Sequence, residues 1–194
     1  MTTRAVIFDM DGTITEGNLD FGQIREEIGM ARDAGPILEA MEQMTEAERL
    51  AAEEILHRRE DEAAQTSTLN HGVREVLAWL AGEGIRLAIL TRNSRVSVDT
   101  VLARHGLRFD LIFTREDGAI KPSAEPVLAI CRTLGVDPAQ TWMVGDYLFD
   151  LQSGNAAGTN TALLWTAPEL PEWHDEADAV LRSLDELRPL IEAS

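Results

Sequence analysis

Five short segments of the chain are almost continuously apolar, and three of them end on a polar side chain. They span residues 5–9, 85–91, 111–113, 142–146 and 161–165. Uninterrupted apolar runs of this length are typical of strands covered on both faces, as in parallel sheets, although length alone does not exclude buried helix. We predict that these segments are the strands of one parallel sheet.

The segments between these runs carry helical periodicity. Apolar residues recur at three- and four-residue spacing before Gly82, Gly106 and Gly135, and glycine commonly ends a helix. Strands and helices that alternate in this way form right-handed strand–helix–strand units. We therefore predict an α/β fold with a doubly wound, Rossmann-like parallel sheet, and a last helix from residue 183 to the end.

Residues 16–72 interrupt this alternation, because they contain no strand-like run. The segment holds 14 of the chain's 34 acidic residues but 5 of its 17 Lys and Arg residues. We predict that residues 16–72 form a small all-helical cap subdomain inserted after the first strand. Residues 1–15 and 73–194 would then form the α/β catalytic core.

The longest predicted helix of this insert begins after Thr45. Thr45 and Glu48 match the capping-box pattern, in which each side chain bonds the backbone of the other residue. Leu50, Ile55 and Leu56 form a thin apolar stripe, and the helical pattern ends near residue 65. The charged run at residues 58–62 is predicted to be a solvated face of this helix.

Composition limits the range of functions. The net charge of −17 repels phosphate backbones and anionic lipid, which disfavours nucleic-acid and membrane partners. No apolar run approaches the ~20 residues of a membrane span, and the one near the N-terminus is too short for a signal peptide. Cys131 is the single cysteine, so the chain has no internal disulfide, and we predict that it is buried. We expect a cytoplasmic protein.

Four carboxylates are predicted to meet at one edge of the sheet. Asp9 and Asp146 end two predicted strands, and Asp11 and Asp150 follow them closely. In open α/β sheets, ligands bind beyond the carboxyl ends of the strands. Crowded carboxylates repel unless a cation neutralises them, and hard oxygen ligands favour Mg²⁺, which commonly keeps water and substrate phosphate as further ligands. Lys121 is the single lysine of the chain, and beside these acids it fits phosphoryl transfer.

These residues resemble the motifs of a known family. Asp9-Met10-Asp11-Gly12-Thr13, Thr91, Lys121-Pro122 and Gly145-Asp146-Tyr147-Leu148-Phe149-Asp150 are similar, in order, to the four motifs of the haloacid dehalogenase superfamily. The resemblance covers the whole chain, because the insert lies where one class of the family has its cap. Its organisation is similar to that of the phosphoglycolate-phosphatase-like members, with a smaller cap.

The resemblance implies a role for each motif in catalysis. Asp9 would attack phosphorus and form an aspartyl-phosphate. Asp11 would protonate the leaving oxygen and then take a proton from the hydrolytic water. Lys121 would reduce the repulsion between carboxylates and stabilise charge on the transferring group, for which a compact ammonium is better suited than a planar guanidinium.

The resemblance also implies the ligands of the metal and the phosphate. Asp9, Asp146 and the backbone carbonyl of Asp11 would bind Mg²⁺, and Asp150 would complete or orient that set. Thr91 would donate a hydrogen bond to a phosphoryl oxygen.

Three further residues are candidates for substrate binding. The backbone N–H of Arg92 could meet the phosphate, and Asn93 could contact either the phosphate or the cap. Arg25, beside Phe21 in the first predicted helix of the insert, could pair with a carboxylate or second phosphate of the substrate.

We therefore expect a Mg²⁺-dependent phosphatase that acts on a small phosphorylated metabolite, with 2-phosphoglycolate as one candidate. Asp11 and Asp146 argue against dehalogenation, and the lack of lysine in residues 16–72 argues against cleavage of phosphonates. Two alternatives stay open. A sugar-phosphate mutase would share all four motifs, and a non-catalytic phosphate-binding regulator would keep the fold.

Overall fold

The computed structural model describes residues 2–193. Its centre is a six-stranded parallel sheet in the order β3-β2-β1-β4-β5-β6. The strands are β1 (Ala5–Phe8), β2 (Arg86–Leu90), β3 (Leu111–Phe113), β4 (Thr141–Gly145), β5 (Asn160–Leu164) and β6 (Ala179–Leu181). This order confirms the predicted doubly wound α/β fold. The chain reverses its direction of winding between β1 and β4, and a reversal of this kind places a ligand crevice at the carboxyl ends of the two strands.

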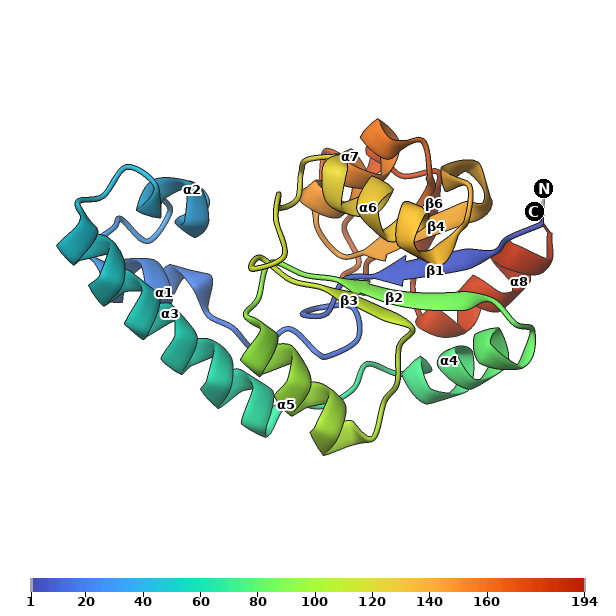
Figure 1. The fold of residues 1–194 in the computed structure, drawn as a ribbon, viewed down its shortest axis with the longest axis horizontal. Coiled ribbons are helices and arrows are strands. Elements are labelled where there is room, and N and C mark those ends of the chain that lie inside the picture. The colour runs from blue at the N-terminus through green and yellow to red at the C-terminus, as the bar shows by residue number, and fades with distance from the viewer. Residues whose placement is uncertain (1, 194) are drawn as a thin grey trace.

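Helices cover both faces of the sheet (Figure 1). One face is covered by α4 (Val73–Gly82), α5 (Arg95–His105) and α8 (Leu187–Glu192), and the other by α6 (Glu125–Leu134) and α7 (Leu148–Ala157). The central strand shows why its sequence is continuously apolar. Val6 and Phe8 pack toward α4 and α8, whereas Ile7 packs toward α6, and all three are fully buried.

The chain after β5 differs from its prediction. β6 is a short edge strand that hydrophobic periodicity did not identify, and the predicted final helix is divided into a 3-10 turn, η3 (Leu184–Glu186), and α8. Two further 3-10 turns are η1 (Pro138–Gln140) and η2 (His174–Glu176). None of the helices among residues 2–193 combines the length and apolarity that a bilayer span requires.

The chain between β1 and α4 forms three helices with a small apolar core of their own, and we refer to residues 16–72 as the insert. It contains α1 (Phe21–Ile28), α2 (Ile37–Met41) and α3 (Glu46–Thr66), and the predicted capping box is present at Thr45 and Glu48. Ile24, Ile37 and Leu56 belong to the apolar cluster that joins the three helices. Figure 1 shows α1 and α2 beyond the carboxyl ends of the strands, while the C-terminal half of α3 runs along α5 of the core.

The predicted stripe of α3 is buried at Leu56 but not at Leu50, which is 56% exposed. The buried positions are Ala52, Leu56, Glu60 and Ala64, which recur every four residues. The prediction that residues 58–62 form a solvated face is therefore wrong at Glu60. Its carboxylate is buried because Arg115 Nη1 donates to Oε1 at 2.5 Å and the Ser94 backbone N–H donates to Oε2 at 3.3 Å.

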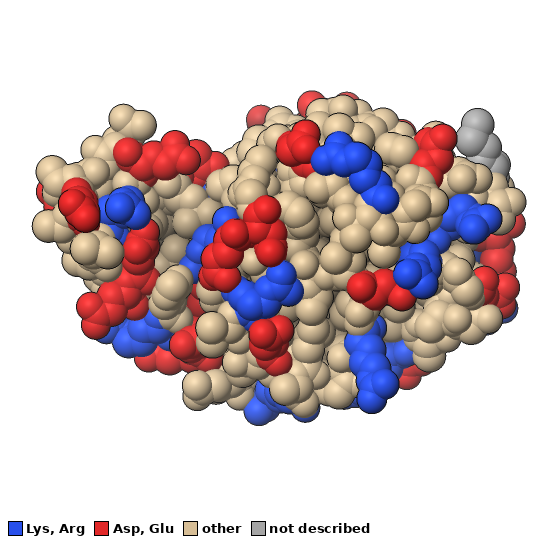
Figure 2. All heavy atoms as spheres, in the orientation of Figure 1, with Lys and Arg blue, Asp and Glu red and all other residues tan. Residues whose placement is uncertain are grey.

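Acidic side chains are spread over the surface and are interspersed with arginines (Figure 2). They are frequent on the insert, as its composition predicts. Several arginines pair with acids inside the insert, for example Arg32 with Asp20 at 2.8 Å and Arg49 with Glu53 at 2.9 Å. Pairs as exposed as these contribute little to stability, because solvent and salt screen their charges.

Candidate active site

The turn after β1 positions two of the acids. The Asp9 N–H donates to the Val144 carbonyl of β4, so Asp9 lies at the point where the two central strands separate. The chain then turns sharply through Gly12, whose φ is +83°. Asn70, at the end of the insert, donates from Nδ2 to the carbonyls of Gly12, Thr13 and Thr15 at 2.9 to 3.1 Å. Asn70, near the end of the insert, thus stabilises the turn that precedes the insert.

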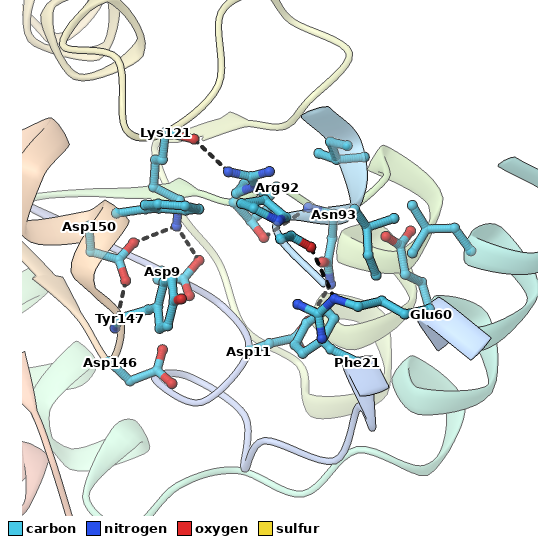
Figure 3. Close-up of a pocket in the computed structure, with 18 of the residues that line it drawn as sticks. Asp9, Asp11, Phe21, Glu60, Arg92, Asn93, Lys121, Asp146, Tyr147 and Asp150 are labelled. Carbon is cyan, nitrogen blue, oxygen red and sulfur yellow. Dashed lines mark hydrogen bonds and ion pairs between the residues drawn. The ribbon is translucent and has the colours of Figure 1, made fainter. Parts of the chain in front are cut away.

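Two carboxylates contact the lysine of the loop before α6, and a third lies beside them (Figure 3). Lys121 Nζ donates to Asp9 Oδ1 and to Asp150 Oδ1, both at 2.6 Å. Asp9, Asp146 and Asp150 each place one carboxylate oxygen within 4.8 Å of the others. Asp150 is held further by the Tyr147 N–H, which donates to Oδ2 at 3.1 Å. The four residues come from three loops at the carboxyl edge of the sheet, as the sequence predicts.

Burial controls the charge of this group. It raises the pKa of Asp146 to about 8, with further increases from the charges of Asp9 and Asp150. It also raises the pKa of Asp150 to about 6, although the Lys121 ammonium opposes the shift. Burial by itself lowers the pKa of Lys121, but the charges of Asp150 and Asp9 outweigh it, so the net shift is upward and the lysine stays protonated.

The donor set fits a hard divalent cation. Three carboxylates lie near one ammonium that contacts two of them, and Thr13 Oγ1 makes a long hydrogen bond of 3.4 Å to the third, Asp146. A cation between Asp9, Asp146 and Asp150 would neutralise the surplus negative charge, and oxygen-only ligands suit Mg²⁺. The Asp11 side chain is outside this group of three, so the expectation that Asp11 contributes through its backbone carbonyl stays a prediction.

Gly12 permits the close approach of Asp146. A Cβ at this position would lie 2.0 Å from Asp146 Oδ2, and the backbone is left-handed. We expect Gly12→Ala to lower the free energy of unfolding for two reasons: alanine is strained in a left-handed backbone, and Asp146 must move. The movement of Asp146 should add at least about 1 kcal/mol to the cost of the backbone strain. Urea denaturation measures this.

Gly29→Ala is the matched control for that measurement. Gly29 has a φ of +89°, and its Cβ would meet no atom within 4 Å. It should therefore show the cost of the left-handed backbone alone, about 1–2 kcal/mol. Equal losses in the two variants would contradict the contact with Asp146.

Asp11 faces away from Lys121 and toward the loop after β2. Asn93 Nδ2 donates to its Oδ2 at 2.5 Å, and Thr15 Oγ1 donates to Oδ1 at 3.2 Å. Burial raises its pKa to about 6; the Asn93 bond opposes this shift, and the charge of Asp9 adds to it. Asn93 thus orients Asp11, a role that the sequence did not suggest. Thr91 Oγ1 accepts a bond from the Asn93 N–H at 3.2 Å, which leaves the hydroxyl proton free to be donated.

Arg92 links the insert to the core. Its Nη2 donates to Glu39 of α2 at 2.6 Å, and its Nη1 donates to the Lys121 carbonyl at 2.8 Å. The guanidinium carbon lies 4.9 Å from the centre of the Phe149 ring. The side chain thus has partners in both the insert and the core, whereas the sequence suggested a role only for the Arg92 backbone.

Arg25 is engaged within the insert. Its Nε donates to the Gly35 carbonyl at 3.0 Å, and its Nη1 donates to the Arg32 carbonyl at 3.4 Å. These bonds fix the loop between α1 and α2. The pairing of Arg25 with substrate stays a prediction, although the residue does line the cavity described next.

A cavity of about 460 Å³ lies between the insert and the carboxyl edge of the sheet. All the predicted site residues line this cavity. Three further lining residues that were not predicted as site residues are Glu60, Tyr147 and Phe149. Tyr147 and Phe149 lie between Asp146 and Asp150 within one motif, so their position at the start of α7 was an available signal. The sequence near Glu60 gave no such signal, because its partner Arg115 lies 55 residues away.

Comparison with known proteins identifies the family. A model of the haloacid dehalogenase-like hydrolases matches residues 3–158. An uncharacterised hydrolase of Saccharomyces cerevisiae is 32% identical, over 97% of this chain and 91% of its own length. The N-acetylmuramic acid 6-phosphate phosphatase of Pseudomonas putida is 29% identical, over 100% of this chain and 98% of its own.

A solved structure agrees with these relatives. The crystal structure of a haloacid dehalogenase-superfamily hydrolase from Geobacter sulfurreducens superposes with a TM-score of 0.67 at 27% identity, covering 97% of this chain and 96% of that one. The chain therefore belongs to the haloacid dehalogenase-like hydrolases, as its motifs predict.

Proposed function

We propose that the protein is a Mg²⁺-dependent phosphatase that hydrolyses a small phosphorylated metabolite through an aspartyl-phosphate on Asp9. The observation that carries this proposal is the cluster of Asp9, Asp146 and Asp150 inside a cavity, with Lys121 bonded to Asp9 and Asp150. A bound Mg²⁺ would be held by these three carboxylates, and it would supply positive charge beside the phosphoryl group.

The first step breaks the ester bond. Lys121 holds Oδ1 of Asp9, so the other carboxylate oxygen attacks phosphorus while the bond from phosphorus to the leaving oxygen breaks. Protonated Asp11 gives its proton to that oxygen, and the product alcohol departs. A buried carboxyl with a pKa of about 6 can hold a proton near neutral pH, as this role requires.

The second step releases phosphate. Asp11, now a carboxylate, takes a proton from a water molecule as the water oxygen attacks phosphorus, and the bond from phosphorus to Asp9 breaks. Asn93 and Thr15 keep the Asp11 carboxylate oriented through both steps. The hydroxyl of Thr91 and the ammonium of Lys121 donate to the phosphoryl oxygens and stabilise their charge.

Residues 16–72 act as a cap in this proposal, over a core of residues 1–15 and 73–194. The insert forms one wall of the cavity and is joined to the core by the pairs Arg92–Glu39 and Arg115–Glu60. Closure of the cap excludes water from the first step, and opening releases the product.

Phosphate release from a panel of phosphorylated metabolites tests the proposal, with Mg²⁺ or with a chelator and with Asp9→Asn as the blank. Metal-dependent release that the variant lacks would support it. An isomerised product with little free phosphate would favour the mutase alternative. No turnover of any compound would favour the regulator.

The stabilisation by Mg²⁺ should be larger at pH 8 than at pH 6. Without metal, Asp146 binds a proton in the folded state but not in the unfolded state between these pH values, because its folded pKa is about 8. Metal-free stability therefore falls as pH rises through this window. A cation must displace that proton, so its affinity rises with pH, by up to about tenfold per unit.

Thermal unfolding with Mg²⁺ and with chelator, at pH 6, 7 and 8, measures this difference. Asp146→Asn serves as the control, because it removes the proton and one ligand together. A shift of the midpoint by Mg²⁺ that is equal at all three pH values would contradict the assignment.

A further inference from the structure

Part of the cavity lining is apolar and rich in aromatic rings. Helices α1, α2 and α3 of the insert contribute one part of it, and the start of α7 contributes the other. The residues are Phe21, Ile37, Leu38, Leu56, Tyr147 and Phe149. A leaving group that extends from a phosphate beside Asp9 enters this part of the cavity.

Two of the rings keep free surface. Tyr147 is 53% exposed and Phe21 is 46% exposed although both line the cavity. In the view of Figure 3, Tyr147 lies on the side of Asp146 and Phe21 on the side of Asp11. Tyr147 is held in place by edge-to-face contacts with Phe149, at 5.1 Å between ring centres, and with Trp173 at 5.8 Å. Fixed, half-exposed rings can cover a second ring at small entropic cost.

The cations that line the cavity are already paired with protein groups. Arg92 binds Glu39 and the Lys121 carbonyl, and its guanidinium covers Phe149. Arg25 binds two backbone carbonyls, and Lys121 binds Asp9 and Asp150. A second anionic group that binds Arg92 or Lys121 would have to displace a carboxylate, and five carboxylates line the cavity around it; Arg25 binds carbonyls and no carboxylate among the described residues.

We propose, on the basis of the phosphatase function above, that this cavity selects phosphate monoesters whose leaving group is a single uncharged ring. Esters that carry a second anion, such as 2-phosphoglycolate, are poor substrates. The rings of Tyr147 and Phe21 recognise the leaving group by contact with its face, and Glu39 sets the preference for neutral substrates by occupying Arg92.

Three primary alkyl phosphates test the two parts of the inference separately. Benzyl phosphate and ethyl phosphate differ by a neutral ring, whereas ethyl phosphate and 2-phosphoglycolate differ by a carboxylate. We expect kcat/KM with Mg²⁺ to be about tenfold higher or more for benzyl than for ethyl phosphate, the scale of a well-packed ring. We expect 2-phosphoglycolate to fall below ethyl phosphate.

Tyr147→Leu tests the ring contact. The variant should reduce the ratio of kcat/KM for benzyl over ethyl phosphate several-fold, mainly through KM. Trp79→Leu is the matched control, because it removes a half-buried ring from α4 that does not line the cavity, and it should keep the wild-type ratio. A ratio between substrates does not respond to a general loss of folded protein.

Glu39→Gln tests the pairing of Arg92. The variant leaves the guanidinium without its carboxylate partner, so kcat/KM for 2-phosphoglycolate should rise several-fold relative to ethyl phosphate. Glu42→Gln is the control, because Glu42 lies one turn further along and does not line the cavity. Its substrate ratio should match that of the wild type.

The outcomes separate this inference from the function on which it rests. Metal-dependent hydrolysis with the ratios above, moved by Tyr147→Leu and Glu39→Gln and by neither control, would support it. Hydrolysis in which benzyl phosphate is no better than ethyl phosphate, or 2-phosphoglycolate is best, would overturn the inference and leave the phosphatase intact. No metal-dependent release from any phosphomonoester would overturn both.

Discussion

Asp9→Asn is expected to lower phosphatase activity by at least ~10⁴-fold, since loss of a nucleophile removes a whole reaction path and not one stabilising contact. The amide keeps the size and shape of the carboxylate. Its nitrogen cannot attack phosphorus as a carboxylate oxygen does, and the variant cannot form the aspartyl-phosphate. Initial rates with the best substrate of the panel measure the loss.

The fold should survive this substitution. Asp9 is one of three crowded carboxylates, and its neutralisation leaves Lys121 paired with Asp150 at 2.6 Å. We therefore expect an unchanged circular-dichroism spectrum, with activity lost from a folded protein. Activity within tenfold of the wild type would exclude Asp9 as the nucleophile, and an unfolded variant would require Asp9→Glu for a second measurement.

The sequence was sufficient for those parts of the site that follow from local pattern and topology. Each of the strands β1 and β4 is an uninterrupted apolar run that ends one residue before an aspartate. Parallel strands bring such ends to one edge, so the meeting of Asp9 and Asp146 follows from the fold class alone. The start of α3 was equally local, because Thr45 and Glu48 satisfy each other across one turn.

The parts that were missed depend on distant partners. Glu60 lies in a charged run, and nothing near it in the sequence indicates that Arg115 neutralises it inside the protein. Asn70 supports the turn at Gly12 from 58 residues away. β6 has three residues and partly exposed side chains, so its apolar signal is too short to distinguish from a loop. Ion pairs and hydrogen bonds between residues far apart in the sequence do not produce a periodic pattern of apolar residues.

The same limit applies to the choice of substrate. The sequence suggested that Arg25 would pair with an anionic leaving group, but it gave no sign that two backbone carbonyls also accept bonds from its guanidinium. The preference for uncharged leaving groups that we infer depends on which protein groups bind the cations of the cavity. The number of these cations and their positions in the sequence do not reveal those partners.

Lys121→Met is expected to lower the free energy of unfolding by about 3–5 kcal/mol without metal, the scale for removing one partner of a buried ion pair. Lys121 is 3% exposed, and its ammonium is the cation that contacts both Asp9 and Asp150. Methionine retains much of the side-chain volume, so the loss reports charge and not a cavity. Urea denaturation with a chelator present measures it.

Mg²⁺ should restore part of that stability but little of the activity. A cation between the same carboxylates offsets their repulsion, so the gain in stability on adding Mg²⁺ should be larger for Lys121→Met than for the wild type. Activity should stay lower by about 10²-fold or more, because no ammonium faces the phosphoryl oxygens. Lys121→Arg, which keeps the charge but fills the space with a planar group, separates the two effects. A Lys121→Met protein with wild-type stability in chelator would show that the ammonium does not hold the acids together.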